Sequence, residues 1–207
     1  YDKFLPKISS VVLKIFIVYL ILTIILFFLY YLNGMSLFDS IAHSFTTIST
    51  GGFSTHNNSF AYFNNISILN IAIVFMILGS FPFLVLAQSS FSNITSIIKD
   101  HQIRLFLIIL ILAISLIYFF AKNYVDGDIH YKISTISFNT ISIISGTGYV
   151  SENFENWGNY ASVLFLILMF IGGCAGSTTG GLKVFRFQIL FKYVSLHFKK
   201  MLKPHIV

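Results

Sequence analysis

Charged residues are scarce in this sequence. Lys, Arg, Asp and Glu together make up 10% of its 207 residues, whereas a soluble domain carries roughly 25%. Hydrophobic residues make up 56%, and the mean hydropathy is +0.84. This shortage of charge excludes an ordinary soluble globular domain and predicts an integral membrane protein in contact with lipid.

Cysteine is nearly absent as well. The single Cys174 lies in an apolar region, so no disulfide can form within the chain. The start, YDKFLPK, has neither an initiator Met nor a signal-peptide pattern, and we expect the chain to be a piece of a longer protein. The sequence shows no nucleophile constellation among its Ser and Thr residues, and nothing indicates an enzyme.

The net charge of +6 is distributed in a way that favours membrane topology over nucleic-acid binding. With the N-terminus in the cytoplasm, the inner segments hold eleven Lys or Arg and two acids, as the positive-inside rule requires. The outer segments hold two Lys and five acids, which would concentrate cations at an outer mouth. The inner residues are Lys3, Lys7, Lys14, Lys99, Arg104, Lys183, Arg186, Lys192, Lys199, Lys200, Lys203, Asp2 and Asp100. The outer residues are Lys122, Lys132, Asp39, Asp126, Asp128, Glu152 and Glu155.

Four apolar segments predict spanning helices, at 15–32, 66–87, 105–121 and 160–172. Gly79 and Pro82 predict a kink or break in the second of them. The basic stretch 187–203 predicts an amphipathic helix that lies on anionic lipid or meets a cytosolic protein.

Two polar, glycine-rich stretches of one design lie between these spans. They read ISTGGFST at 48–55 and ISGTGYVS at 144–151, 96 positions later. Short helices at 36–49 and 131–144 precede them, too short to cross a bilayer. The first could be a re-entrant pore helix, capped by Ser36 with Asp39 in a capping box, or a surface helix. The repetition predicts an all-α membrane protein of two units, 1–95 and 96–207, each built as helix, pore helix, filter loop and helix.

The two loops have the composition of an ion-selectivity filter. A dehydrated potassium ion is held by rings of backbone carbonyls, and glycine permits the backbone conformation that such rings need. The alternative is a pair of glycine-rich turns between helices. We expect the aromatic residue after the last glycine of each loop to pack against the pore helix. The predicted potassium-binding residues are Thr50, Gly51, Gly52, Phe53, Gly146, Thr147, Gly148 and Tyr149.

A third polar stretch, GGCAGSTTGGLK, follows the fourth apolar segment. Irregular backbone at membrane depth is tolerated only beside a cavity or inside protein, so 172–181 is predicted to be an intramembrane gating loop below the filter. A seam of small residues between packed helices is the alternative. Basic residues at this depth need a partner or water. Lys183 and Arg186 could contact the loop carbonyls or simply mark the cytoplasmic interface, which is the interpretation favoured for Arg186. The predicted gating residues are Gly172, Gly173, Gly176, Ser177, Thr178, Thr179, Gly180, Gly181 and Lys183. His43 and His56 are interpreted as surface or loop contacts.

Both motifs resemble a known family. AHSFTTISTGGFSTHN at 42–57 and FIGGCAGSTTGGLKVFR at 170–186 are similar to the second filter region and the gating loop of the bacterial TrkH potassium-uptake subunits of the Trk/Ktr/HKT superfamily. The resemblance covers nearly the whole chain and implies that it holds the second and third of four pore units arranged with pseudo-fourfold symmetry.

The resemblance carries further expectations. It implies a multi-pass protein of the bacterial cytoplasmic (inner) membrane that transports K⁺, has no organic cofactor and binds no nucleic acid. Its implied partners are membrane lipid, the remaining pore units, a second copy in a homodimer and a cytosolic TrkA-type nucleotide-binding subunit. Gly146 and Asn57 depart from the family pattern, in which Thr and Asp are usual, and Cys174 favours a Trk-like over a Ktr-like member. A non-conducting membrane subunit that assembles with a partner is the alternative function.

Overall fold

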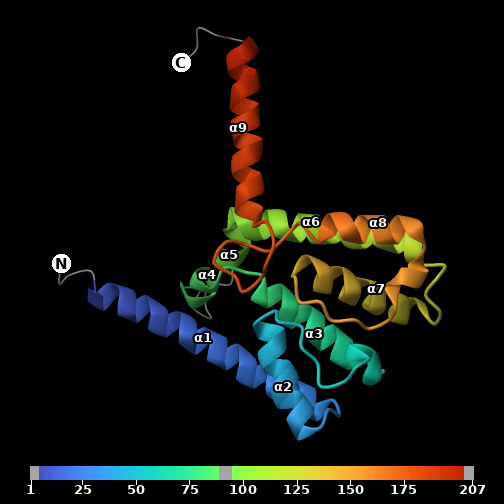
Figure 1. Ribbon diagram of the computed structural model, residues 1–207. Coiled ribbons are helices and arrows are strands. Elements are labelled where there is room, and N and C mark those ends of the chain that lie inside the picture. Colours follow the sequence, from blue (N-terminus) through green and yellow to red (C-terminus); the bar gives the residue numbers. More distant parts are fainter. Residues whose placement is uncertain (1–4, 89–94, 203–207) are drawn as a thin grey trace.

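The computed structural model describes residues 5–88 and 95–202, and these residues fold into helices joined by loops (Figure 1). The predicted all-α class is confirmed over this part of the chain. The charge assignments made for Asp2, Lys3 and Lys203 lie outside the described residues.

The first half begins with α1 (Leu5–Leu32), which ends at Asn33-Gly34, where Gly34 has φ +102°. The short helix α2 (Leu37–Ile48) starts at the predicted cap, because Ser36 Oγ accepts from the Asp39 amide at 3.1 Å. The Asp39 carboxylate accepts from the Ser36 hydroxyl at 2.7 Å, whereas in a capping box it would accept from the Ser36 amide. The remaining elements of this half are η1 (Ser59–Tyr62), α3 (Ile66–Gly79) and α4 (Phe83–Gln88).

The second half repeats this order. The helix α6 begins at His101 rather than at Leu105, because the Asp100 carboxylate caps it by accepting from the amides of Gln102 and Ile103 at 2.8 and 3.1 Å. The elements of this half are α5 (Thr95–Lys99), α6 (His101–Ala121), α7 (Ile129–Ile144), η2 (Phe154–Trp157), α8 (Asn159–Leu168) and α9 (Val184–Leu202).

Two of the described helices are long and apolar enough to cross a bilayer, over Ile8–Leu32 and His101–Ala121. The other two predicted spans are interrupted. The predicted break at Gly79 and Pro82 is confirmed, since α3 ends at Gly79 and α4 begins directly after Pro82, which has no amide hydrogen to donate. The predicted interruption of the last span is also confirmed, because α8 ends at Leu168 and helix resumes only at Val184.

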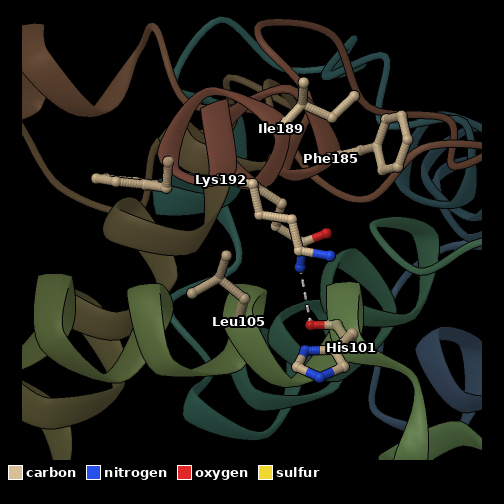
Figure 2. A pocket seen from close by; sticks show the side chains of 7 residues that line it. His101, Leu105, Phe185, Ile189 and Lys192 are labelled. Atoms are coloured by element: carbon tan, nitrogen blue, oxygen red, sulfur yellow. Dashed lines mark hydrogen bonds between the residues drawn. The ribbon is translucent and has the colours of Figure 1, made fainter. Parts of the chain in front are cut away.

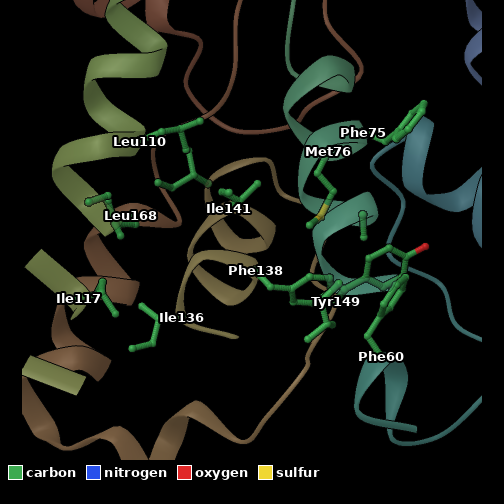
Figure 3. Close-up of a cluster of buried hydrophobic side chains, with 14 of the residues drawn as sticks. Phe60, Phe75, Met76, Leu110, Ile117, Ile136, Phe138, Ile141, Tyr149 and Leu168 are labelled. Atoms are coloured by element: carbon green, nitrogen blue, oxygen red, sulfur yellow. The ribbon is translucent and has the colours of Figure 1, made fainter. Parts of the chain in front are cut away.

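The two halves share one core. Helix α3 of the first half packs against α7 of the second, and α7 packs in turn against α6 (Figure 3). Met76 on α3, Phe138 and Ile141 on α7, and Leu110 on α6 are all at most 2% exposed and form the centre of this contact. Helix α2 packs in a similar way against α1 and α3, so longer helices hold both short helices in place.

Helix α9 leaves the rest of the molecule at a steep angle to α6 and α8 (Figure 1). Its first turns are held by a hydrogen bond from Gln188 Nε2 to the His101 carbonyl at 3.1 Å, beside a mainly apolar pocket between α6 and α9 (Figure 2). Its lysines, Lys192, Lys199 and Lys200, lie on a helix whose residues are mostly exposed.

Candidate functional site

The two glycine loops, residues 48–55 and 144–151, have left-handed backbone at two matched positions. Thr50 has φ +50° and its repeat partner Gly146 has φ +70°. Gly52 has φ +71° and its partner Gly148 has φ +82°. Positive φ is common for glycine but uncommon for a residue such as Thr50, so the two loops correspond in local backbone conformation as well as in sequence.

The hydrogen bonds that begin each loop also correspond. The Thr50 amide donates to the Thr47 carbonyl at 3.1 Å, as Gly146 does to Ile143 at 3.0 Å. The Gly52 amide donates to the Thr46 carbonyl at 3.4 Å, and the Gly148 amide donates to the Ser142 carbonyl at 3.2 Å. Each loop is thus turned back over the last turn of its short helix.

The left-handed backbone at position 146 explains why glycine is accommodated there. A β-branched residue is strained in the left-handed region, and Thr50 adopts it while its hydroxyl donates to the Ser49 carbonyl at 2.7 Å. Glycine at position 146 takes the same conformation without that strain. The departure of Gly146 from the pattern of TrkH-like proteins is therefore compatible with the backbone of this loop.

The aromatic residues that follow the two loops differ. Tyr149 is 1% exposed, and its hydroxyl lies 2.6 Å from Thr46 Oγ1 and 3.2 Å from Thr47 Oγ1 on α2, the short helix of the other half. Phe53 is 77% exposed. The expectation that the aromatic residue packs against a short helix is met by Tyr149, which reaches α2 of the other half, and is wrong for Phe53, whose side chain is exposed.

Phe60 completes an aromatic cluster around Tyr149. Its ring centroid lies 4.4 Å from that of Tyr149 and 5.1 Å from that of Phe138 (Figure 3). The His43 ring lies 5.3 Å away. The interpretation of His43 as a surface residue is wrong, since its side chain is fully buried. Its role in contacting a loop is confirmed by the 2.9 Å contact between its Nε2 and Ser54 Oγ.

Its sequence position places Asp39 among the acids at the outer mouth, but in the structure it is a buried, hydrogen-bonded carboxylate. It is 8% exposed, and its carboxylate accepts hydrogen bonds from Ser36 Oγ at 2.7 Å and from Thr55 Oγ1 at 2.6 Å. His56 Nε2 lies 3.3 Å from the same carboxylate, while its ring stacks on Tyr62 at 3.6 Å. Asp39 therefore fastens the chain after Gly52 to the start of α2.

The stretch between α8 and α9 forms a closed loop, residues 172–183. The Gly172 amide donates to the Leu182 carbonyl at 2.9 Å, and the Val184 amide donates to the Gly173 carbonyl at 3.1 Å. A β-carbon on Gly172 would lie 2.1 Å from the Gly180 carbonyl oxygen, so only glycine lets the two sides approach this closely. The structure thus supports a folded loop rather than a straight seam of small residues along a helix.

This closed loop reaches the first glycine loop. Thr178 Oγ1 lies 3.0 Å from the carbonyl oxygens of both Ile48 and Gly79, and 3.3 Å from Thr50 Oγ1. The Cys174 amide also donates to the Ser80 carbonyl at 3.0 Å. The carbonyls freed where α3 ends are thus satisfied by the closed loop, which links the two interruptions in the helices.

Lys183 bends back over the closed loop. Its ammonium donates to the Thr179 carbonyl, to Thr179 Oγ1 at 3.0 Å and toward Ser177 Oγ at 3.4 Å. Of the two alternatives for this lysine, the structure shows contact with a loop carbonyl, that of Thr179. Gly176, Gly180 and Gly181 lie on the exposed side of the loop.

Several residues around these loops were not predicted from the sequence. Tyr30 on α1 lies 3.1 Å from Thr47 Oγ1 through its hydroxyl, and Asn139 on α7 is 1% exposed and hydrogen-bonded to Ser151. Asn139 stands 96 positions after His43. A polar residue at the same position in both copies of the repeat could have identified this pair from the sequence.

Comparison with known proteins gives the family. A family model described as TrkH, cation transport protein, matches residues 1–207. The chain is 33% identical over 190 residues to the Trk system potassium uptake protein TrkI of Halomonas elongata and 36% identical over 192 residues to TrkG of Escherichia coli. These matches cover 91% and 92% of the chain, but only 38% and 40% of the two relatives.

A solved structure agrees. The crystal structure of the potassium transporter TrkH from Vibrio parahaemolyticus matches with a TM-score of 0.90 at 33% identity, over 98% of this chain and 44% of that one. The predicted all-α membrane fold class is thereby confirmed, and the chain spans less than half the length of the relatives it matches. This chain belongs to the TrkH family of cation transport proteins.

Proposed function

We propose that the two glycine loops contribute backbone carbonyls to the selectivity filter of a potassium-uptake protein, and that residues 1–95 and 96–207 are two of its pore units. The observation that carries the proposal is the matched left-handed backbone at Thr50 and Gly146 and at Gly52 and Gly148. Rings of carbonyls replace the hydration shell of an ion only when several loops present them in the same way. The relatives are named as potassium uptake proteins, which supports K⁺ as the ion.

The closed loop at 172–183 is proposed as the gate. It carries glycine and hydroxyl residues between two helices, and its Thr178 lies 3.0 Å from the carbonyl of Ile48, the residue that ends α2 at the first glycine loop. A loop in this position can obstruct a path that continues from the filter. The hydrogen bonds that hold it against α2 and α3 come from the Thr178 hydroxyl and from isolated backbone amides such as that of Cys174. These bonds can break without unfolding a helix.

The setting follows from the charge distribution and from the family resemblance. We place the protein in the bacterial cytoplasmic membrane, with the N-terminal end of this chain in the cytoplasm, as the positive-inside rule favours. The proposed partners are the remaining pore units of a longer chain, a second copy in a homodimer and a TrkA-type cytosolic subunit. The proposed cargo is K⁺, with no organic cofactor and no catalytic chemistry.

The test is rescue of growth. A bacterium that lacks its own potassium-uptake systems is given the full-length gene and grown at low external potassium. Growth together with uptake of K⁺ supports the proposal. Expression in the membrane without growth or uptake contradicts it and favours a non-conducting subunit that assembles with a partner.

A further inference from the structure

Beyond its glycines, each glycine loop is contacted by a buried polar side chain of its own short helix, here called its anchor, in addition to the Asp39–Thr55 and Tyr149 hydroxyl contacts described above. We define the exit limbs as residues 53–55 and 149–151, which follow Gly52 and Gly148. His43 Nε2 lies 2.9 Å from Ser54 Oγ in the first exit limb. Asn139 Nδ2 donates to Ser151 Oγ in the second at 2.9 Å, and the Ser151 amide donates to Asn139 Oδ1 at 3.2 Å.

The two anchors use the same geometry with different residue types. His43 Nδ1 lies 2.8 Å from the Asp39 carbonyl, and Asn139 Nδ2 donates to the Thr135 carbonyl at 3.2 Å, each four residues back on its own helix. The Asp39 carbonyl can only accept, so Nδ1 of His43 carries the proton and Nε2 accepts from the Ser54 hydroxyl. Each side chain therefore ties the backbone of its short helix to the exit limb of the loop above it.

Sequence spacing alone does not produce this correspondence. His43 and Asn139 are 96 positions apart, like the loops, but Ser54 and Ser151 are one position out of register with the repeat. The residue in register with Ser54 is Val150, which has no side-chain hydroxyl. In the second copy the contact is therefore made by a different helix residue and by a serine one position later. Because both copies make the contact with different residues, we infer that both loops need it.

Both anchors are shielded from water. His43 is fully buried among the rings of Phe60 and Phe63, with centroids at 5.3 and 5.2 Å, and Asn139 is 1% exposed. Hydrogen bonds in such surroundings are strong, and breaking one leaves a buried polar group without a partner.

We propose that His43 and Asn139 are positioning residues that set the aim of the carbonyls of the two glycine loops. This inference rests on the proposed filter function. Each loop starts at the helix end, through the amides of Gly52 and Gly148, and is held beyond its glycines by His43 or Asn139. The carbonyls between the two anchors keep their direction only while both ends are held.

The experiment is a double-mutant cycle in the full-length protein, reconstituted in liposomes, with uptake of K⁺ and of Na⁺ measured separately. H43F and S54A are each expected to lower the ratio of K⁺ to Na⁺ uptake by about threefold to tenfold, the scale set by one buried hydrogen bond. Because both variants break the same link, the double variant loses no more than the worse single variant. N139L and S151A behave in the same way.

Matched controls separate positioning from stability. H43Q places an amide near the Nε2 position, and we expect it to restore the ratio that H43F loses. S44A and T140V remove buried hydroxyls that bond only to their own helices, to the carbonyls of Ile41 and Ile136, and should leave the ratio within twofold of wild type.

Three results would overturn the inference. Unchanged ratios in H43F and N139L, with normal uptake of K⁺, overturn it while leaving the proposed function intact. Losses that multiply in the double variants show that the partners act separately. Absence of any K⁺ uptake by the wild-type protein overturns the proposed function together with this inference.

Discussion

Gly52 of the first glycine loop meets Thr147 of the second so closely that a β-carbon on Gly52 would lie 1.6 Å from the Thr147 carbonyl oxygen. Real β-carbons do not approach an oxygen to this distance, so at this point the backbones of the two loops lie in direct contact. Since Gly52 also has φ +71°, glycine is required here for two separate reasons. The contact joins the two halves of the chain at the residues proposed to bind K⁺.

The first prediction concerns this contact. G52A in the full-length protein forces the loops apart and strains the backbone, and we expect a loss of several degrees in melting temperature in detergent. The left-handed conformation alone costs an alanine roughly 1–2 kcal/mol. G51A is the matched control, because Gly51 has no left-handed φ and a β-carbon there meets first the Ser49 hydroxyl, at 3.1 Å. Equal melting temperatures for the two variants would contradict the contact.

Tyr149 provides the second prediction. Y149F keeps the ring in its cluster but removes the hydroxyl that bonds Thr46 and Thr47 across the two halves. We expect a loss of about 1 kcal/mol in stability, the usual net value of such a bond, and a lower ratio of K⁺ to Na⁺ uptake. Y160F is the control, since Tyr160 is 73% exposed. If Y149F and Y160F have the same effect, the hydroxyl link does not hold the loop.

Thr178 is the basis of the third prediction. T178V keeps the shape of the side chain and removes the hydroxyl that lies 3.0 Å from the carbonyls of Ile48 and Gly79. The closed loop should then leave its position more often, so basal K⁺ flux in the full-length protein rises. T178S retains the hydroxyl and should behave like wild type. Flux that is unchanged in T178V, or raised equally in T178S, would argue against a gate held by this contact.

The fourth prediction separates two glycines of the closed loop. G172A places a β-carbon 2.1 Å from the Gly180 carbonyl oxygen, whereas a β-carbon on Gly180 meets nothing within 4 Å. Overpacking of this kind typically costs about 1–3 kcal/mol, so G172A should lower the melting temperature and alter basal flux. G180A should stay within about 0.5 kcal/mol of wild type, as open surface sites do. A more harmful G180A would show that the loop does not close as described.

The sequence was sufficient to predict features that depend on local chemistry. The glycine loops, the cap at Ser36, the break between Gly79 and Pro82 and the repeat of 96 positions each follow from residue types and spacing. Contacts between the two halves could not be predicted in this way. Which helices pack together decides the burial of His43, the exposure of Phe53 and the contact of Tyr149 with α2. The local sequence does not determine that packing.

The assignment of the two loops as a potassium filter is tested most directly by selectivity. Uptake of K⁺ and Na⁺ is measured side by side in liposomes that contain the full-length protein, its G52A variant or its G148A variant. Because both glycines hold left-handed backbone at matched places, the account predicts that both variants lose preference for K⁺ over Na⁺. A preference that is unchanged from wild type in both variants would contradict it.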